Sequence, residues 1–376
     1  MADPRKIVLL GATGSIGEST LTVIREHPDQ FQLIGAAANR NTEALERIAA
    51  EFSVDHTALF EKEGLDGLLK LATLPDAEVV IVATTGTIAV RPTIAALEAG
   101  KTVGLANKET LVLAGAFVMP VAKDSAGTLL PVDSEHNAIF QCLEGLRDPA
   151  DLKRLVLTAS GGPFLHHTLR ELEHVKLEDA LRHPNWDMGT KVTIDSATMA
   201  NKGLEMIEAH WLYDSEPSKI DVVIHPQSII HSMVEFVDGS VIAQMAPPSM
   251  TLPIQHVLAW PSKVAACAPT LDFSRIHKLE LRPPDLEKFP CLRLAREALE
   301  QGGIAPAMFN ASNEVAVKAF VGNQLRFVAI PQLIEDCLES AEFSMPSSLD
   351  ELLSLETEML AFAKDRLSQL KDPEPE

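Results

Sequence analysis

The sequence is poor in cysteine and in positive charge, and each shortage excludes a class of protein. Its 376 residues include only 4 cysteines, none of them in a CxxC pair. A disulfide framework and a structural zinc site are therefore not expected, and a reducing cytoplasm fits this composition. Lys and Arg number 32 against 53 Asp and Glu, which gives a formal net charge of -21 at pH 7. So acidic a chain is a poor partner for nucleic acid or an anionic membrane.

Long apolar runs are also lacking. No run approaches the roughly 20 residues that a membrane-spanning helix needs. At the start, MADPRKIVLLGATG, glycines interrupt the apolar stretch, so we expect a strand and a turn there instead of a signal or transit peptide. With 46% hydrophobic and 5% aromatic residues, the composition fits a globular protein of two or three domains. We expect a cytoplasmic protein whose partner is a small molecule.

In the first third of the chain, short apolar runs alternate with amphipathic stretches of helical spacing. The runs cover residues 6–10, 32–38, 79–83 and 102–105. Such alternation is typical of an α/β fold, in which helices cover both faces of a parallel sheet. We therefore predict a Rossmann-like dinucleotide-binding domain at residues 1–128.

From residue 129 the apolar runs end in Ser, Asp, Glu or His, as in LLPVDSEHN, LVLTASGGPF, KVTIDSATM and VVIHPQSIIH. Because ligand groups of open α/β sheets lie at the carboxyl ends of strands, residues 129–262 are predicted to form a catalytic α/β domain. Its loop 181–191, bounded by Pro and Gly, is the candidate lid. A hairpin is expected at 234–245, around Asp238-Gly239.

The last part of the chain changes character again. Residues 263–287 are proline-rich and weakly periodic, which indicates a linker. Residues 288–370 have helical spacing and predict a C-terminal α-helical bundle, and the tail 371–376 is expected to be disordered. The expected helices are 291–301, 306–320, 331–340 and 348–370.

The stretch GATGSIG lies between the first expected strand and the first helix. Gly11, Gly14 and Gly17 would let a diphosphate approach the helix N-terminus closely, although a purely structural turn is the alternative. At the end of the second strand, AAANRN has no acidic residue before Glu43. Arg40 suits a 2′-phosphate and favours NADP over NAD, unless it is only a solvent-facing arginine.

A second candidate site is a set of carboxylates. Asp133 and Glu135 are two apart at the end of an expected strand, so both should point to one face with Ser134 between them. Glu205 could join them. Three carboxylates without cysteine suit a hard cation, Mg²⁺ or Mn²⁺. The alternative is a strand-end turn with capping side chains.

The segment Asp195 to Trp211 predicts one helix that opens at an Asp/Ser cap. Its apolar stripe should face a core and consists of Met199, Leu204, Ile207 and Trp211. The polar residues near the positive helix end suit an anion beside a cation, and they are Ser196, Asn201, Lys202 and Glu205. A solvated helix face is the alternative.

Three further segments carry candidate ligands. SGGPF, from Ser160, offers a hydroxyl and two glycine amides to an oxyanion, or forms a plain turn. Asn107, Lys108 and Glu109 follow an expected strand and should lie at the cleft, unless Lys108 is a surface lysine. His183 and Trp186 lie on the candidate lid, where a tryptophan can also simply pack against a neighbour.

Seven of these stretches occur together and in order: GATGSIG, ANKET, LLPVDSEHNAIFQ, SGGPF, HPNWDMG, DSATMANKGLE and HPQSIIHSMVEF. The set closely resembles the 1-deoxy-D-xylulose 5-phosphate reductoisomerase family, from Lys6 to about Pro261. The resemblance implies the rearrangement and reduction of 1-deoxy-D-xylulose 5-phosphate to 2-C-methyl-D-erythritol 4-phosphate in isoprenoid precursor synthesis. It also implies NADPH, Mg²⁺ or Mn²⁺, and a homodimer, for which the hairpin 234–245 is the candidate interface.

The resemblance further implies roles for individual residues. The metal ligands would be Asp133, Glu135 and Glu205. Lys108, Ser134 and Glu135 would contact the substrate near the metal, with Lys108 and His183 counted as catalytic beside the metal ligands. The substrate's phosphate would be held by Ser160, Ser196, Asn201 and Lys202. His183 and Trp186 would close the lid over the substrate.

NADPH contacts follow from the same resemblance. The diphosphate would lie on Thr13, Gly14, Ser15 and Ile16. The 2′-phosphate end would lie at Asn39, Arg40 and Asn41, where the family often has Gly-Lys or Gly-Ser. The nicotinamide half would be held by Asn107, Glu109 and Gly189.

Two other functions remain open from the sequence. A simple NADP-dependent aldehyde dehydrogenase or reductase would need no metal, and the carboxylate set would then have no role. A non-catalytic NADP sensor would keep GATGSIG but would have no reason to place Ser196, Lys202 and Glu205 together. The carboxylates therefore discriminate between the three hypotheses.

Overall fold

The structure, a computed structural model, describes residues 3–186, 188–276, 278–341 and 344–370. The expected disordered tail, 371–376, and Asp187 of the candidate lid lie outside the described residues. The chain divides into two compact units. Unit 1 comprises Met1–Leu111, Gly115–Glu144 and Gln244–Phe273, and unit 2 comprises Val112–Ala114, Gly145–Ala243 and Ser274–Glu376.

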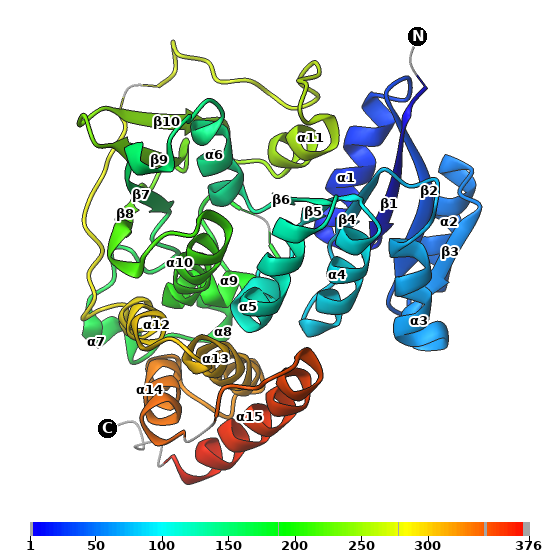
Figure 1. The fold of residues 1–376 in the computed structure, drawn as a ribbon. Helices are drawn as coiled ribbons and strands as arrows, with labels where there is room; N and C mark the ends of the chain where they lie inside the picture. Colours follow the sequence, from blue (N-terminus) through cyan, green and yellow to red (C-terminus); the bar gives the residue numbers. More distant parts are fainter. Residues whose placement is uncertain (1–2, 187, 277, 342–343, 371–376) are drawn as a thin grey trace. The chain divides into compact units, whose positions relative to one another are not determined.

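Unit 1 contains a six-stranded sheet with the order β3-β2-β1-β4-β5-β6, coloured blue to cyan in Figure 1. Every described pairing in it is parallel. This is the doubly wound, Rossmann-type order, so the predicted α/β fold is confirmed. The strands are β1 Arg5–Leu10, β2 Phe31–Ala38, β3 His56–Leu59, β4 Val79–Val82, β5 Thr102–Leu105 and β6 Thr128–Pro131.

Helices follow the strands of this sheet in alternation. They are α1 Ser15–Glu26, α2 Thr42–Phe52, α3 Phe60–Ala72, α4 Val90–Glu98, α5 Glu109–Asp124 and α6 Ser134–Leu143, with a 3-10 turn η1 Thr87–Ala89. The central strand β4 is fully buried over its whole length. Helices that cover both faces of a parallel sheet bury its central strands completely, which is why these strands are continuous apolar runs in the sequence.

Helix α11, Thr251–Ala259, also belongs to unit 1. Its Ile254 and Val257 lie in the same apolar cluster as Ile7 of β1. The Arg5 guanidinium donates to the carbonyls of Leu258 (2.9 Å) and Trp260 (2.7 Å). Because β6, α6 and α11 complete the core of the parallel sheet, the units differ from the domains expected with a boundary after residue 128.

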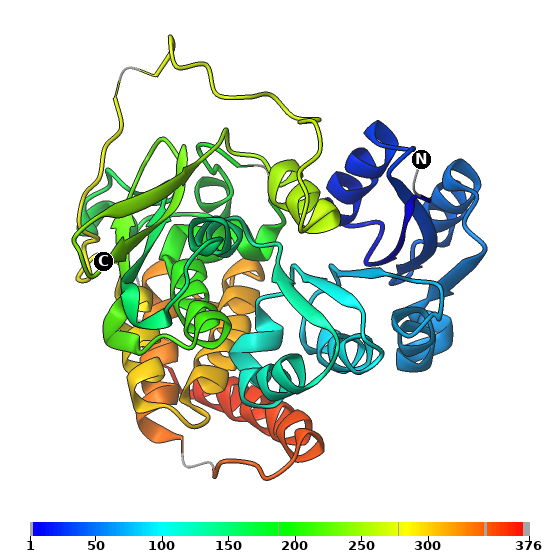
Figure 2. The ribbon, with the colours of Figure 1, turned by 45° about the horizontal axis from the view of Figure 1, so that its top comes forward.

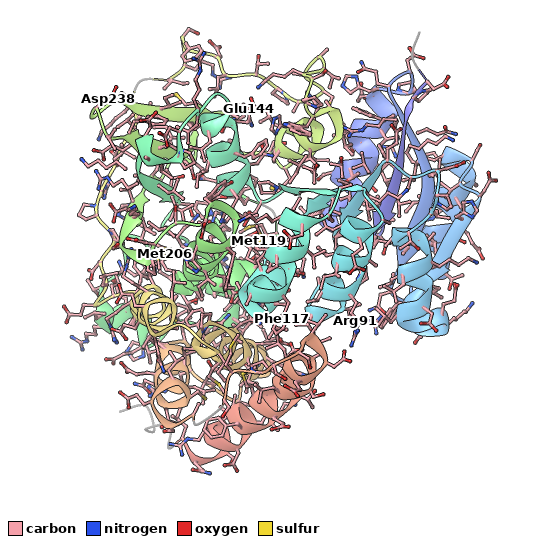
Figure 3. All side chains as sticks on the ribbon, viewed as in Figure 1. Arg91, Phe117, Met119, Glu144, Met206 and Asp238 are labelled. Carbon is pink, nitrogen blue, oxygen red and sulfur yellow. The ribbon has the colours of Figure 1, made fainter. Side chains whose placement is uncertain are left out.

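Unit 2 is built on a four-stranded mixed sheet with the order β10-β9-β7-β8. Its strands are β7 Leu152–Ala159, β8 Ile220–Ile224, β9 Ile230–Phe236 and β10 Val241–Met245. Strand β7 pairs parallel with β8 and antiparallel with β9. The expected hairpin is present, with Asp238 at its tip in Figure 3 and Gly239 at a φ of +84°.

The prediction of one helix from Asp195 to Trp211 is wrong. Two helices occur, α9 Thr190–Thr198 and α10 Ala200–Tyr213, preceded by the short α7 Leu169–Leu172 and α8 Leu177–Ala180. Met199 adopts a left-handed conformation (φ 63°) that separates α9 from α10. Asp195 therefore lies inside a helix and caps none. Of the predicted apolar stripe, Met199, Leu204 and Ile207 are buried, whereas Trp211 is only half-buried.

The C-terminal helical region was predicted well. Its helices are α12 Pro290–Gln301, α13 Ala305–Val321, α14 Ile330–Ser340 and α15 Leu349–Gln369. Between α11 and α12 the described residues form a long extended segment without a helix, visible in Figure 2. Within the described parts of the chain, no helix combines the length and the apolarity needed to cross a membrane.

Candidate functional site

The turn between β1 and α1 depends on two glycines, Gly11 and Gly17, whose positions leave no room for a Cβ. Gly11 has a φ of +94°, and a Cβ on it would lie 2.4 Å from the carbonyl oxygen of Ala83. A Cβ on Gly17 would lie 2.4 Å from the carbonyl oxygen of Gly11. Gly14 is the N-cap of α1 and has no capping side chain. The first turn of α1 therefore exposes backbone N–H groups, which favour an anion.

A cavity opens over this turn, and it includes Thr13, Gly14 and Asn39 of the predicted ligands. It is lined by Gly11, Thr13, Gly14, Ala37, Ala38, Asn39, Phe60, Leu68, Ala83, Thr84, Thr85 and Ile88. Sequence reasoning missed Phe60 and Leu68 because they follow β3, a strand without a long apolar run. Thr84 and Thr85 directly follow β4, and their place at a strand end could have identified them.

Four other predicted dinucleotide ligands of unit 1 directly follow lining residues of this cavity in the sequence and have different structural roles. Ser15 and Ile16 are in the first turn of α1, and Arg40 is exposed at the end of β2. The Asn41 side chain caps α2 by accepting from the backbone N–H of Ala44 at 3.1 Å. That Arg40 and Asn41 bind a 2′-phosphate stays a prediction.

Asn107 shapes the wall of the cavity. It is buried, and its Nδ2 donates to the carbonyls of Thr84 (2.9 Å) and Gly86 (3.1 Å). Its Oδ1 accepts from the backbone N–H and the hydroxyl of Thr110. The amide thus ties the end of β5 to the loop after β4. Glu109 begins α5 directly beyond it.

The carboxylates of unit 1 gather at the start of α6, and we call Lys108, Asp133, Ser134 and Glu135 the α6 cluster. The Nζ of Lys108 lies 2.7 Å from Oδ2 of Asp133, whose Oδ1 accepts from the backbone N–H of Ser134 at 3.1 Å. The Ser134 hydroxyl donates to Glu135 at 2.6 Å. The prediction that Asp133 and Glu135 share a strand face is wrong, because β6 ends at Pro131 and α6 begins at Ser134.

Asp133 is a strong acid in this setting. Burial raises the pKa of its carboxyl, but the ammonium of Lys108 and the ring of His136 oppose burial and lower it. The net result is a pKa well below the usual range of aspartate. Asp133 therefore carries its negative charge at neutral pH, as a cation ligand must.

Unit 2 holds a second carboxylate in a different environment, and we call Asn201, Lys202 and Glu205 the α10 cluster. Glu205 is only 1% exposed and Lys202 only 4%. The Lys202 ammonium donates to one oxygen of Glu205, and the Asn201 amide donates to the other. A predicted metal ligand and two predicted phosphate ligands thus form one hydrogen-bonded group on α10. Met206, the residue after Glu205, is labelled in Figure 3 and marks the position of this group.

Ser160 and His183 form a pair in unit 2. The Oγ of Ser160 lies 3.0 Å from Nε2 of His183 and accepts from the backbone N–H of Gly162 at 3.1 Å. Nδ1 of His183 accepts from the backbone N–H groups of Asn185 and Trp186. Nδ1 is therefore unprotonated, and Nε2–H donates to Ser160. Burial lowers the pKa of His183 to about 4, so the ring is neutral at pH 7.

The centre of the candidate lid is hydrogen-bonded to the segment between β8 and β9. Nδ2 of Asn185 donates to the carbonyl of Pro226 (2.7 Å) and to the hydroxyl of Ser228 (2.9 Å). The next residue, Trp186, packs edge-on against His231 with 6.2 Å between ring centroids. The loop ends at Gly189, which caps α9.

The glycines of the SGGPF stretch bring Ser160 close to α9. Gly162 has a φ of +65°, and a Cβ on it would lie 2.7 Å from the carbonyl oxygen of Ser196. Two of the predicted phosphate ligands, Ser160 and Ser196, are thus on backbone segments in direct contact. The predicted metal ligands are divided between the units, Asp133 and Glu135 in unit 1 and Glu205 in unit 2. That they hold one cation stays a prediction.

Models of a single protein family match most of the chain. The model described as 1-deoxy-D-xylulose 5-phosphate reductoisomerase matches residues 7–68 and 62–115. The C-terminal domain of the same enzyme matches residues 129–213, and the DXP reductoisomerase C-terminal domain matches residues 245–361.

Relatives and solved structures agree with these models. Proteins named 1-deoxy-D-xylulose 5-phosphate reductoisomerase from Agathobacter rectalis and Geobacillus kaustophilus are each 46% identical, covering 94% and 96% of this chain and 97% and 99% of theirs. The Zymomonas mobilis enzyme in complex with NADPH superposes with a TM-score of 0.91 at 40% identity, over 98% of this chain and 100% of that one. A structure with NADPH, fosmidomycin and magnesium gives 0.92 at 37% identity, over 98% and 99%. The chain belongs to the 1-deoxy-D-xylulose 5-phosphate reductoisomerase family.

Proposed function

We propose that this protein converts 1-deoxy-D-xylulose 5-phosphate to 2-C-methyl-D-erythritol 4-phosphate with NADPH and a divalent cation, as an oxidoreductase of isoprenoid precursor synthesis. The observation that carries this proposal is the α10 cluster, where a buried carboxylate, an ammonium and an amide are bonded together. A simple dehydrogenase or an NADP sensor has no use for it. The substrate, which carries a phosphate at one end and vicinal oxygens at the other, needs both kinds of ligand.

The carboxylates have the chemistry of a magnesium or manganese site. Asp133, Glu135 and Glu205 offer only oxygen atoms, and the low pKa of Asp133 keeps it anionic. The bound cation would polarise the substrate's carbonyl and stabilise developing negative charge on oxygen. Lys108 is held within 2.7 Å of Asp133. From there its ammonium reaches the substrate next to the cation.

Ser160 is prepared to donate to the substrate's phosphate. Its Oγ accepts two hydrogen bonds, from His183 and from Gly162, so its own proton is directed outward. Ser196 lies on the backbone segment that contacts Gly162, and Lys202 and Asn201 supply further donors. Holding the phosphate away from the reacting carbons orients them and drives closure of the lid with His183 and Trp186. Closure excludes water while the carbon skeleton rearranges and the aldehyde is reduced.

NADPH binds in the glycine-lined cavity of unit 1, with its diphosphate on the N-terminal turn of α1. Thr13, Gly14, Ser15 and Ile16 supply the backbone groups of that turn. Asn39, Arg40 and Asn41, at the end of β2, take the 2′-phosphate end, which is why the exposed Arg40 matters. Asn107, Glu109 and Gly189 take the nicotinamide half.

The test of this function follows NADPH absorbance with 1-deoxy-D-xylulose 5-phosphate as substrate. Protein stripped with a chelator is assayed before and after Mg²⁺ or Mn²⁺ is restored. We expect oxidation of NADPH that depends on the added metal. Metal-independent oxidation would favour the simple reductase, and NADPH binding without any oxidation would favour the sensor.

Replacing Gly17 by alanine should disrupt the dinucleotide site from within the fold. The new methyl would lie 2.4 and 2.5 Å from the carbonyl oxygens of Gly11 and Ala12, so α1 must shift. We expect Gly17→Ala to lower the melting temperature by several degrees and to weaken NADPH binding roughly tenfold or more. Gly14→Ala is the control for stability, since its nearest atom would be 3.5 Å away. Equal melting of Gly17→Ala and wild type would contradict the packing argument.

A homodimer formed at the edge strand β10 is part of the proposal. Val237, Val241 and Ile242 of the hairpin are 61%, 53% and 48% exposed, an apolar group at a sheet edge. Unpaired edges of this kind associate with a second chain. We expect light scattering to give twice the monomer mass for wild type and the monomer mass for Ile242→Lys. A variant that stays dimeric would place the interface elsewhere.

The free cysteines fit a cytoplasmic location.

A further inference from the structure

Asp195 is a buried charge for which the proposed reaction has no use. It precedes Ser196 in α9 and is 1% exposed. Its Oδ1 accepts from Nδ2 of Asn313 at 2.9 Å, and its Oδ2 lies 2.9 Å from Nζ of Lys191. One carboxylate oxygen is therefore held by α13 of the C-terminal helices and the other by the first turn of its own helix.

Asn313 donates a hydrogen bond to another helix, whereas its neighbour Ser312 does not. Both Asn313 and Ser312 are fully buried on α13. The Ser312 hydroxyl donates back to the carbonyls of Met308 (2.8 Å) and Phe309 (3.1 Å) of its own helix. Asn313 instead reaches across to α9. Without this donor, the Asp195 carboxylate would be buried with one oxygen unsatisfied, which is unfavourable. Asp195, and with it α9, would then shift to find another partner, so the position of α9 depends on the Asn313 amide.

The SGGPF stretch is attached to the same C-terminal helices. Phe164 is 1% exposed and packs edge-on against Phe327, with 4.9 Å between ring centroids. Phe327 in turn contacts Phe320 of α13. The ammonium of Lys288 donates to the carbonyl of Leu165 at 2.8 Å. The loop that carries Ser160 is therefore anchored on its far side.

Helix α10 also contacts the C-terminal helices, at Gly203, the residue after Lys202. A Cβ on Gly203 would lie 2.4 Å from the Cβ of Ala295 in α12, so the two helices touch at backbone distance. Each of the segments that carry Ser160, Ser196 and Lys202 thus packs on the C-terminal helices. The contacts differ in kind: a ring stack, a hydrogen-bonded carboxylate and a close helix crossing.

We propose that Asn313 is a positioning residue that sets Ser196 through Asp195, and that the C-terminal helices thereby fix the geometry of the phosphate pocket. This inference rests on the proposed function, which places the phosphate at Ser196. Binding groups must be held within about half an ångström of their productive positions. A shift of α9 therefore weakens the contact of Ser196 with the phosphate before it affects the proposed metal ligands, which lie on other elements. The diphosphate of NADPH binds at α1, and only Gly189 at the start of α9 would contact the nicotinamide half, so NADPH binding depends much less on the position of α9.

Asn313→Leu removes the donor while keeping the number and branching of the side-chain heavy atoms, and Ser312→Ala is its matched control on the same helix. We expect Asn313→Leu to raise the KM for 1-deoxy-D-xylulose 5-phosphate roughly tenfold to hundredfold, the range expected when the hydrogen bond from Ser196 to the charged phosphate is lost. The inhibition constant of inorganic phosphate should rise in parallel, while kcat and the Kd for NADPH change much less. Ser312→Ala should leave all four values near those of wild type.

An unchanged KM in folded Asn313→Leu, or an equal rise in Ser312→Ala, overturns the inference. If Asn313→Leu does not fold, Lys191→Met tests the same carboxylate from its partly exposed side, where the lysine side chain is 32% exposed. A smaller rise in KM is expected there, and an unchanged KM overturns the inference. Line broadening of inorganic phosphate in ³¹P spectra needs no turnover. Weaker broadening by Asn313→Leu than by wild type supports the positioning role of Asn313, even if wild type does not turn over the sugar phosphate. Such inactivity of wild type would refute only the proposed function.

Discussion

Glu205→Gln should abolish metal-dependent turnover while leaving NADPH binding in unit 1 intact. The substitution removes one negative charge from the proposed cation site. It also puts an amide N–H₂ where Lys202 or Asn201 now donates, so one donor loses its acceptor. We expect kcat/KM for 1-deoxy-D-xylulose 5-phosphate to fall by about three orders of magnitude or more, comparable to the loss of one electrostatic contact in a transition state. Progress curves of NADPH absorbance at saturating Mg²⁺ measure it.

The control for this variant must separate lost chemistry from lost stability. Breaking a buried ion pair by removing one partner costs about 3–5 kcal/mol, whereas replacing both partners by apolar residues is often neutral. The double variant Lys202→Met with Glu205→Leu should therefore melt nearer to wild type than Glu205→Gln does, and yet remain inactive. Activity near that of wild type in Glu205→Gln would remove Glu205 from the metal site.

The fold could be predicted where burial leaves a continuous pattern. Strands β1, β2, β4 and β5 were found because both faces of the parallel sheet are covered. Strand β3 was missed because only its last two residues are buried, so its sequence, HTAL, is no apolar run. The packing of α11 on unit 1 depends on contacts between residues more than 200 positions apart, such as Arg5 with Leu258. No local pattern reveals such a contact.

Local backbone geometry limited the prediction of the site in a different way. The segments PVDSEHN and DSATMANKGLE were selected for the chemistry of their side chains, but the secondary structure predicted for them was wrong. Asp133 lies two residues beyond the end of β6 and caps α6, and Met199 separates α9 from α10 with a left-handed conformation. A single non-glycine residue with positive φ leaves no trace in hydrophobic spacing. Asn313 could not be found from the sequence, since nothing before the fold relates it to Asp195.

The proposed metal and phosphate ligands on α10 belong to one hydrogen-bonded group of charges. Glu205 is held by Lys202 and Asn201, so a proposed cation ligand and two proposed phosphate ligands orient each other on successive turns of α10. A cation bound to Glu205 would weaken the hydrogen bond from Lys202 to Glu205 and make the ammonium available to the phosphate. We therefore expect binding of the two ends of the substrate to be coupled through this buried side-chain pair.

Lys202→Met tests the proposed phosphate role of the ammonium through substrate selectivity. The ammonium supplies a charge-assisted hydrogen bond to a phosphate, worth roughly 10- to 100-fold in affinity, and it has no counterpart in a substrate that lacks the phosphate. We therefore expect Lys202→Met to reduce kcat/KM for 1-deoxy-D-xylulose 5-phosphate about 100-fold, and to reduce it much less for the unphosphorylated sugar, 1-deoxy-D-xylulose. The ratio of the two values is the readout, because a general loss of folded protein or a disturbed Glu205 lowers both equally. A ratio unchanged from wild type would exclude Lys202 from the phosphate site and leave its ammonium only the structural task of balancing Glu205.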